Sequence, residues 1–245
     1  MTKPDPTLIL RDDRIVHTVE QLSRRITDRF PGSSLSSLCD QLLKVAQQSA
    51  ERSRWIAKPI RWLRWTGYAI AAFLIIMLIG SIWFAIKNLD AEQVDVLELI
   101  SAIEAGINEV ILLAIAVFFL VNVEVRIKRR RALAAIHELR SIAHVIDMHQ
   151  LTKDPERLLS DWADAAHSPK ETLTPFQMNR YLDYCSEMLS LTGKIAALTV
   201  QHFDDAEAIR AVGEVEDLTT GLSRKIWQKI MMLEQSRVSG LVSSQ

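Results

Sequence analysis

Two long stretches of apolar residues interrupt an otherwise mixed pattern of hydrophobic and polar positions. The first covers residues 66–86 and contains no charged side chain. An apolar helix of about 20 residues is long enough to cross the hydrocarbon core of a bilayer. Trp62 and Trp65 precede this stretch and Trp83 lies near its far end, where aromatic residues of membrane proteins meet the headgroups. The pattern predicts a membrane-spanning helix over about residues 66–86.

The second apolar stretch is shorter, and its uninterrupted part covers only residues 110–121. A helix of that length is about 18 Å long, whereas the hydrocarbon core is about 30 Å thick. Extending it outward to residues 107–125 places Glu109 near one headgroup layer and Glu124 near the other. A basic run over residues 126–131 follows directly, and such long side chains can reach the headgroups. We therefore predict a second span over about residues 107–125.

Lysine and arginine are distributed asymmetrically around the two spans. The segment from Lys87 to Glu109 has one lysine against six acidic residues, whereas basic residues gather on the other side of each span. The positive-inside rule therefore predicts that both termini lie in the cytoplasm and that the acidic loop 87–106 lies outside. We expect the basic flanks to contact anionic lipid headgroups, through Arg61, Arg64, Arg126, Lys128, Arg129, Arg130 and Arg131.

Outside the spans, apolar residues recur every three or four positions, which is the period of an amphipathic helix. These stripes cover residues 15–26, 35–45, 181–198 and 209–233. Glycine (8) and proline (7) are scarce, which favours long helices over a turn-rich sheet. The predicted fold class is all-α: a two-span helical membrane protein with a cytoplasmic helical bundle or coiled-coil region. Its predicted parts are residues 1–64, 65–126 and 127–245.

Local signals mark where these helices should begin and end. Pro31-Gly32 should end the first helix, and the second should begin within residues 33–37. The helix of the second span should continue beyond the membrane, because no glycine or proline occurs between Ile107 and Asp154. Further start signals then follow, with an N-cap at Asp154 and capping boxes that begin at Ser168, Thr174 and Asp204.

An amphipathic helix should lead from the acidic loop into the second span, because apolar residues recur at positions 96, 100, 103, 107 and 110. Asn108 and Glu109 lie at the end of this helix. Polar groups at membrane depth are candidate functional residues, so these two form a candidate pore mouth or helix interface. The alternative is an interfacial helix that turns its acidic residues to water, and the position at the edge of the span favours that alternative.

A second polar cluster follows the basic run. His137 and His144 lie seven residues apart, hence on one helix face, and Arg140 and Asp147 flank that face. We expect a polar seam against neighbouring helices in which Arg140 and Asp147 pair, and a pH-sensing role is an alternative. A zinc site on a helix needs histidines four residues apart, whereas these two are about 10 Å apart along the axis. A metal-dependent enzyme that uses His137 and His144 is therefore only a remote alternative.

Other chemistry has little support in the sequence. The net charge of −1 gives no general reason to expect a nucleic-acid partner. Cys39 and Cys185 form neither a disulfide framework nor a metal-spaced pair, so we expect reduced thiols packed in a core. No phosphate-binding loop or nucleophile elbow is present, and no cofactor or metal is expected.

Taken as a whole, these patterns predict an integral protein of the cell inner or plasma membrane that is not an enzyme. Its cytoplasmic helical bundle would mediate self-assembly or binding of a cytoplasmic protein partner, and a homo-oligomer is expected because single apolar stripes suit intermolecular coiled coils. The alternative from a different class is an ion-conducting or membrane-permeabilising oligomer that is lined by the second span.

Overall fold

The computed structural model describes residues 10–56, 58, 61–88, 96–151, 153 and 173–242. Every regular element in these ranges is an α-helix, which confirms the all-α class. The helices are α1 (Asp12–Arg29), α2 (Ser34–Ile56), α3 (Arg61–Asn88), α4 (Val96–Leu151), α6 (Pro175–Val200) and α7 (Ala206–Val242). The predicted starts at Asp154 and Ser168 lie outside the described residues.

The chain forms two compact units. The first, which we call the bundle, combines residues 1–57 with residues 131–245, and the second, which we call the hairpin, is residues 58–130. Helix α4 belongs to both units, because it runs without a break from Val96 to Leu151. The predicted continuation of the second span into a long helix is therefore confirmed as far as Leu151.

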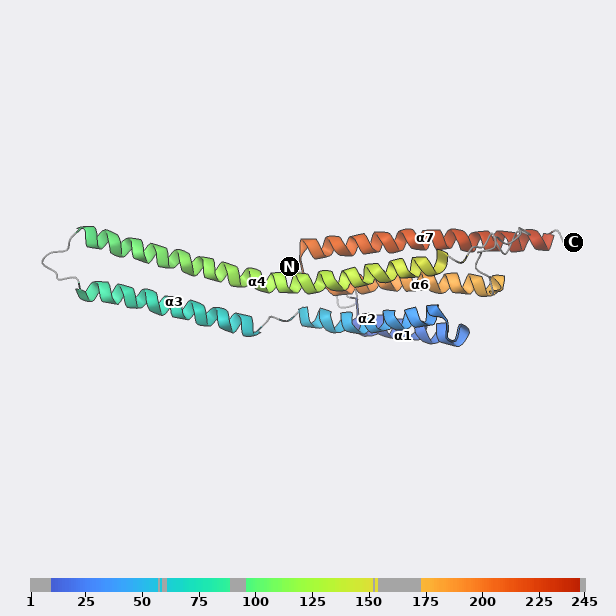
Figure 1. Cartoon of the computed structure of the whole chain (residues 1–245), viewed down its shortest axis with the longest axis horizontal. Helices are drawn as coiled ribbons and strands as arrows, with labels where there is room; N and C mark the ends of the chain where they lie inside the picture. The colour runs from blue at the N-terminus through green and yellow to red at the C-terminus, as the bar shows by residue number, and fades with distance from the viewer. Residues whose placement is uncertain are drawn as a thin grey trace, which may run out of the picture. The chain divides into compact units, whose positions relative to one another are not determined.

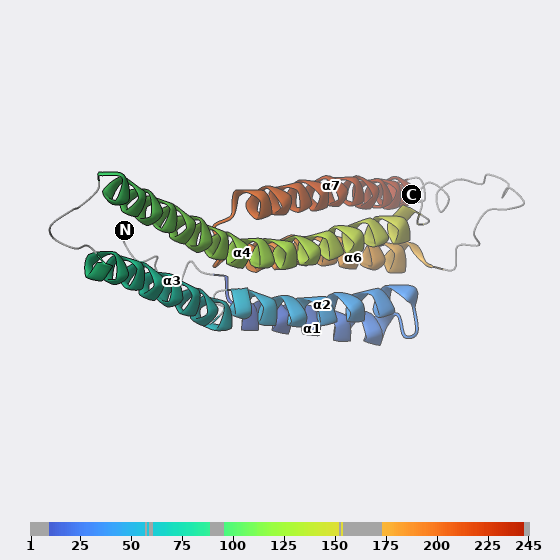
Figure 2. The same ribbon diagram turned by 60° about the vertical axis from the view of Figure 1, so that its left-hand side comes forward.

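Five helical segments share the core of the bundle. Figures 1 and 2 show α1, α2, α6, α7 and the C-terminal part of α4 running side by side. Their fully buried side chains include Leu22, Ile26, Leu35, Leu42, Ile136, Leu139, Ile146, Met178, Leu182, Met188, Leu189 and Ile195. These positions repeat at helical spacing in α1, α2, α4 and α6, and the buried Val215, Leu222 and Ile226 do so in α7, so each helix turns one stripe inward. Truncating one such side chain to alanine costs about 2–5 kcal/mol, and the shared core therefore holds helices from both ends of the chain together.

The first two helices are separated by a tight turn. Gly32 has a φ of 67°, a left-handed conformation that only glycine adopts without strain. Phe30 N donates a hydrogen bond to Ile26 O at 2.7 Å at the end of α1. Helix α2 begins at Ser34, within the predicted range of residues 33–37, and Pro31-Gly32 ends the first helix as predicted.

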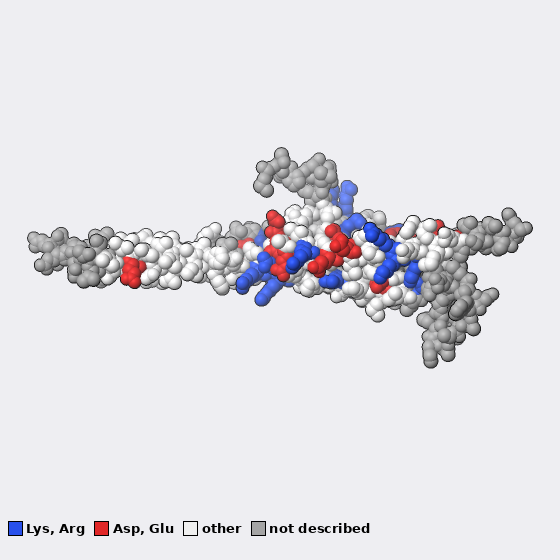
Figure 3. All heavy atoms as spheres, turned by 90° about the horizontal axis from the view of Figure 1, so that it is seen from above, with Lys and Arg blue, Asp and Glu red and all other residues white. Residues whose placement is uncertain are grey.

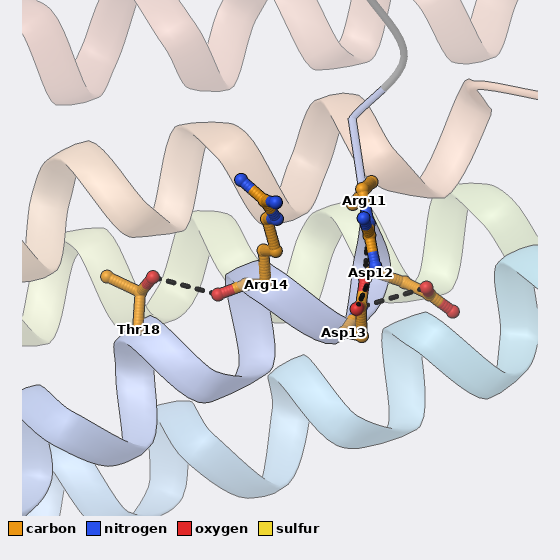
Figure 4. A network of polar contacts seen from close by, with 5 residues as sticks. All are labelled: Arg11, Asp12, Asp13, Arg14 and Thr18. Carbon is orange, nitrogen blue, oxygen red and sulfur yellow. Dashed lines mark hydrogen bonds and ion pairs between the residues drawn. The ribbon is translucent and has the colours of Figure 1, made fainter. Parts of the chain in front are cut away.

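The start of α1 is stabilised by charge rather than by a side-chain cap (Figure 4). Arg11 Nη2 donates to Asp13 Oδ2 at 2.6 Å and Arg11 Nε donates to Asp13 Oδ1 at 3.1 Å. The hydrogen bonds from Arg11 lower the pKa of Asp13 below its ordinary value. Asp12 Oδ2 lies 2.9 Å from Arg54 Nε, which links the start of α1 to α2. Both acidic residues are in the first turn, where they interact favourably with the helix dipole.

The two C-terminal helices begin at side-chain caps. The capping box at Thr174 is confirmed: Gln177 N donates to Thr174 Oγ1 at 3.2 Å, and Thr174 N donates to Gln177 Oε1 at 2.9 Å. The predicted box at Asp204 is wrong by one residue, because Ala208 N donates to the buried Asp205 Oδ1 at 3.1 Å. Asp205 is the residue whose short side chain can reach that amide once the helix begins at Ala206.

The hairpin consists of α3 and the N-terminal part of α4, which run side by side in Figures 1 and 2. These are two helices long and apolar enough to cross a membrane, over Trp65–Trp83 in α3 and within Gly106–Leu151 in α4. None of the most apolar part of either helix is buried inside the structure. Figure 3 shows few charged side chains on the visible face of the described hairpin, whereas both signs of charge are mixed over the bundle.

Candidate functional site

A polar contact joins the two helices of the hairpin. Ser81 Oγ, on α3, lies 3.2 Å from Glu109 Oε2, on α4. The same hydroxyl lies 2.9 Å from Leu78 O, and its single proton can serve only one acceptor at a time. Glu109 is half-buried and faces α3, whereas Asn108 is exposed. The structure therefore separates the two residues that the sequence grouped as a candidate pore mouth or interface.

Ser81 is a partner that the sequence analysis missed. It is one of two serines or threonines in the stretch 66–86, and nothing around it in α3 marks it as a partner for an acidic residue. Its role depends on the register between α3 and α4, which sets it opposite Glu109. Hydrogen bonds between membrane helices contribute about 0.6 kcal/mol on average, so a contact of this kind adds little stability.

The polar residues at the other end of the second predicted span also have partners. Asn122 Nδ2 donates to Phe118 O at 2.7 Å, one turn earlier in the same helix. Lys128 Nζ lies 3.0 Å from Glu124 Oε1, and these two side chains are only 13% and 14% exposed. An ion pair with so little solvent exposure keeps the Lys128 ammonium group close to the helix. Lys128 is therefore less available for a lipid headgroup than the sequence alone suggests.

The remaining basic residues near the hairpin fall into three groups. Arg126 and Arg130 are exposed, and Arg129 is half-buried. The side chains of Arg61 and Arg64 lie outside the described residues.

The three predicted interfacial tryptophans are all more than 60% exposed: Trp62, Trp65 and Trp83. Lys87 Nζ lies 5.0 Å from the centre of the Trp83 ring.

Arg131 differs from the other members of the basic run because it belongs to the bundle. Its guanidinium carbon lies 4.0 Å from the centre of the Trp55 ring, at the C-terminal end of α2. A cation held over an indole face at this distance is attracted by the electrons of the ring. The contact places Arg131 beside α2, an arrangement that the sequence analysis did not foresee.

Arg131 and Trp55 line a groove between α2 and α4 with a volume of about 580 Å³. Its lining residues are Glu51, Arg52, Trp55, Arg131, Ala134 and Glu138. Arg52 Nη1 lies 3.3 Å from Glu138 Oε2, and Arg52 Nη2 donates to Gln48 Oε1 at 3.1 Å. The groove is thus walled by charged side chains of both signs, and one ion pair spans it from α2 to α4.

The histidine cluster on α4 does not form the predicted seam. His137 and His144 share a face, as their spacing requires, but both are exposed. The buried face of this part of α4 is made by Ile136, Leu139 and Ile146. The prediction of a packed polar seam is therefore wrong for the two histidines, because the apolar residues of the same segment occupy the face that meets the core.

The predicted pairing of Arg140 with Asp147 is also wrong. Arg140 Nη1 lies 3.3 Å from Glu214 Oε2 of α7, and Asp147 Oδ1 accepts a hydrogen bond from Gln150 Nε2 at 2.6 Å. Seven residues separate Arg140 from Asp147 along α4, about 10 Å of helical rise, whereas each has a closer partner. Within the described residues, no group of three histidine, cysteine or acidic side chains is placed to hold a metal ion.

The C-terminal end of α4 is capped by a lysine from α7. Lys229 Nζ donates to Gln150 O at 2.8 Å and to Lys153 O at 3.0 Å. The last carbonyl groups of a helix lack partners within the helix and carry partial negative charge, so an ammonium group there is stabilising. Nearby, Ser34 Oγ lies 3.4 Å from His149 Nδ1, and burial lowers the pKa of His149.

The two cysteines are buried and free, which confirms the expectation of reduced thiols in a core. Burial raises the pKa of Cys39 and of Cys185 to about 12. The thiolate is the reactive form of cysteine, so neither side chain is suited to nucleophilic chemistry in the folded bundle.

Comparison with known proteins gives no relative. No family model, no curated protein and no solved structure matches the chain.

Proposed function

We propose that this chain is a non-enzymatic membrane anchor whose helical bundle assembles with copies of itself or binds a protein partner. In this proposal α3 and the N-terminal part of α4 cross the membrane, and both termini lie in the cytoplasm. The bundle, residues 1–57 and 131–245, is then the cytoplasmic part.

The observation that carries the proposal is the exposed apolar surface of the hairpin. Large apolar side chains of α4 are exposed along the predicted span, among them Ile111, Leu112, Ile115, Phe118 and Phe119. A soluble protein rarely exposes so large a contiguous apolar surface. A bilayer covers it without another protein, and the length of both helices suits that environment.

Exposed apolar residues on the bundle support the assembly part of the proposal. Met148 and Leu151 of α4 are 66% and 62% exposed, and Trp227 of α7 is 62% exposed. Tryptophan and methionine are enriched where proteins bind one another. On the face that Figure 3 shows, the bundle carries side chains of both charges, and a polar rim of this kind commonly surrounds the apolar residues of an interface.

An ion-conducting oligomer is the second candidate, and the contact between Ser81 and Glu109 is the observation that favours it. A ring of carboxylates at a pore mouth concentrates cations. Against it, the exposed residues of α4 that follow Glu109 are apolar over 110–119. A narrow path lined by such residues expels water, so the anchor explains more of the hairpin than the pore does.

The orientation is tested by labelling single cysteines in intact cells with a membrane-impermeant maleimide. Gln93→Cys lies in the predicted outer loop and should label, whereas Gln228→Cys on the exposed face of α7 should label only after the cells are opened. The native thiols give no information here, because their burial protects them on either side of the membrane. Labelling of Gln228→Cys in intact cells would overturn the proposed orientation.

Assembly is tested by native mass spectrometry of the full chain in detergent. We expect a closed homo-oligomer or a complex with a protein partner, and a strictly monomeric chain that captures no partner contradicts this part of the proposal. A measurement of ion flux in liposomes distinguishes the anchor from the ion-conducting oligomer, because the anchor predicts no ion flux.

A further inference from the structure

The groove between α2 and α4 carries balanced charge. Two guanidinium groups, of Arg52 and Arg131, face two carboxylates, of Glu51 and Glu138, so the formal charges sum to zero. Arg52 and Glu138 already pair at 3.3 Å. In the part of the chain that the structure describes, neither Arg131 nor Glu51 has an ion-pair partner. One positive and one negative group are thus left to a ligand that carries both signs.

Trp55 holds the Arg131 side chain in place for such a ligand. The guanidinium carbon lies 4.0 Å from the ring centre. A guanidinium group that is attracted to a ring in this way can still donate its N–H groups to phosphate oxygens in pairs. The groove volume of about 580 Å³ lies within the range of small-molecule sites.

Arg131 is also the last residue of the basic run over residues 126–131, which directly follows the second predicted span. Basic residues at the end of a membrane span are attracted by lipid headgroups. The groove therefore includes a residue from a flank that the sequence predicts to meet lipid.

From these observations we propose that the groove binds the zwitterionic headgroup of an aminophospholipid, which carries a phosphodiester and a primary ammonium group. This inference rests on the proposed membrane insertion of the hairpin. The phosphate accepts hydrogen bonds from Arg131, and the ammonium group donates to Glu51. Trp55 orients Arg131 and contacts the glycerol region of the lipid.

The charge pattern distinguishes this headgroup from two others. An anionic headgroup without an ammonium group leaves Glu51 unpaired beside a phosphate, which is repulsive. A choline headgroup has no N–H donor for Glu51, and its quaternary ammonium group instead favours an open aromatic face, whereas one face of Trp55 is covered by Arg131.

The test is native mass spectrometry of the full chain in detergent, titrated separately with phosphatidylethanolamine, phosphatidylglycerol and phosphatidylcholine. We expect one site that prefers phosphatidylethanolamine about tenfold over the other two. Arg131→Gln and Glu51→Gln should each weaken it about tenfold, the effect of losing one charge-assisted contact. Glu51→Gln should not weaken the binding of phosphatidylglycerol. The matched controls are Arg224→Gln and Glu234→Gln, both exposed residues of α7 outside the groove.

Equal or tighter binding of phosphatidylglycerol or phosphatidylcholine overturns the proposal, as does an equal loss in Arg224→Gln. Absence of any retained phosphatidylethanolamine also overturns it. If Arg131→Gln does not fold, Arg131→Lys provides the second variant: it keeps the charge but loses the paired donors, and binding should still fall. Failure of the orientation test by cysteine labelling is a separate result, because it concerns the hairpin and not the preference among lipids.

Discussion

The hydrogen bond between Ser81 and Glu109 provides a sharp test of whether the hairpin anchors or conducts. Ser81→Ala removes the donor, and Glu109→Gln removes the charge but keeps a carbonyl oxygen that can accept. The Ser81 hydroxyl lies 3.2 Å from Glu109 Oε2 and 2.9 Å from Leu78 O. The single Ser81 proton can go to either acceptor, so the loss of Glu109 as an acceptor leaves Leu78 O in place.

This geometry sets the expected magnitude. Double-mutant cycles on hydrogen bonds between membrane helices give about 0.6 kcal/mol on average and about 1.7 kcal/mol at most. With an alternative acceptor on the same helix, we expect each single substitution to change the free energy of unfolding by less than about 1 kcal/mol, and a coupling energy of about 0.6 kcal/mol. Glu104→Gln, at an exposed position of the same helix, is the matched control and should show no coupling to Ser81→Ala.

The assay is reversible unfolding in mixed detergent micelles, combined with cation flux in liposomes made from the same preparations. We expect no flux from the native chain or from Glu109→Gln. A coupling energy above about 2 kcal/mol would contradict this expectation, because it would mean that Leu78 O does not act as an alternative acceptor for the Ser81 hydroxyl. The pore would be supported, and the anchor refuted, by cation flux through the native chain that is reduced in Glu109→Gln or has a different ion selectivity in that variant.

Three further predictions concern the bundle. Lys229→Met should lower the free energy of unfolding by about 2 kcal/mol and the melting temperature by about 4–8 °C. The control Lys225→Met, at a neighbouring exposed position, should lower neither. Equal losses of stability in the two variants would contradict the role of Lys229 as a cap of α4. His144→Ala should change stability by less than about 0.5 kcal/mol, whereas Ile146→Ala should cost about 2–5 kcal/mol; a large loss in His144→Ala would restore the packed seam. Burial lowers the pKa of His149 below its ordinary 6.5, so the folded state binds a proton less readily than the unfolded state. The free energy of unfolding should therefore fall as the pH drops below about 6.5. His149→Gln should make the free energy of unfolding less dependent on pH in this range. An unchanged pH dependence would contradict its assignment to His149.

Much of the fold could be predicted from the sequence because each helix carries its own signals. The cap at Thr174 and the turn at Gly32 depend on residues within a few positions of each other, so local rules were sufficient. The stripes of buried residues were also predictable, since a period of three to four residues identifies the inward face of each helix.

The contacts between helices could not be predicted in the same way. Lys229 caps α4 from 79 residues away in the chain, and Arg140 pairs with Glu214 rather than with a residue of its own helix. Such contacts depend on the rotation and register of one helix against another, which a single sequence does not encode in any local pattern. The histidines illustrate the limit: their spacing placed them on one face correctly, but only the packed structure shows that this face is exposed.

The way in which polar groups of the hairpin are satisfied bears on its function. Asn122 donates to the carbonyl of Phe118, one turn earlier in its own helix, and Lys128 pairs with Glu124. Ser81 lies within reach of Glu109 and of a carbonyl of its own helix. Unpaired polar groups in hydrocarbon are costly, so each of these local partners lowers the cost of exposing the helix to lipid. A conducting path needs the opposite, polar groups that are left open toward water and ions. This side-chain chemistry favours the proposed anchor over the pore, and in that proposal the function lies in what the bundle and its groove bind.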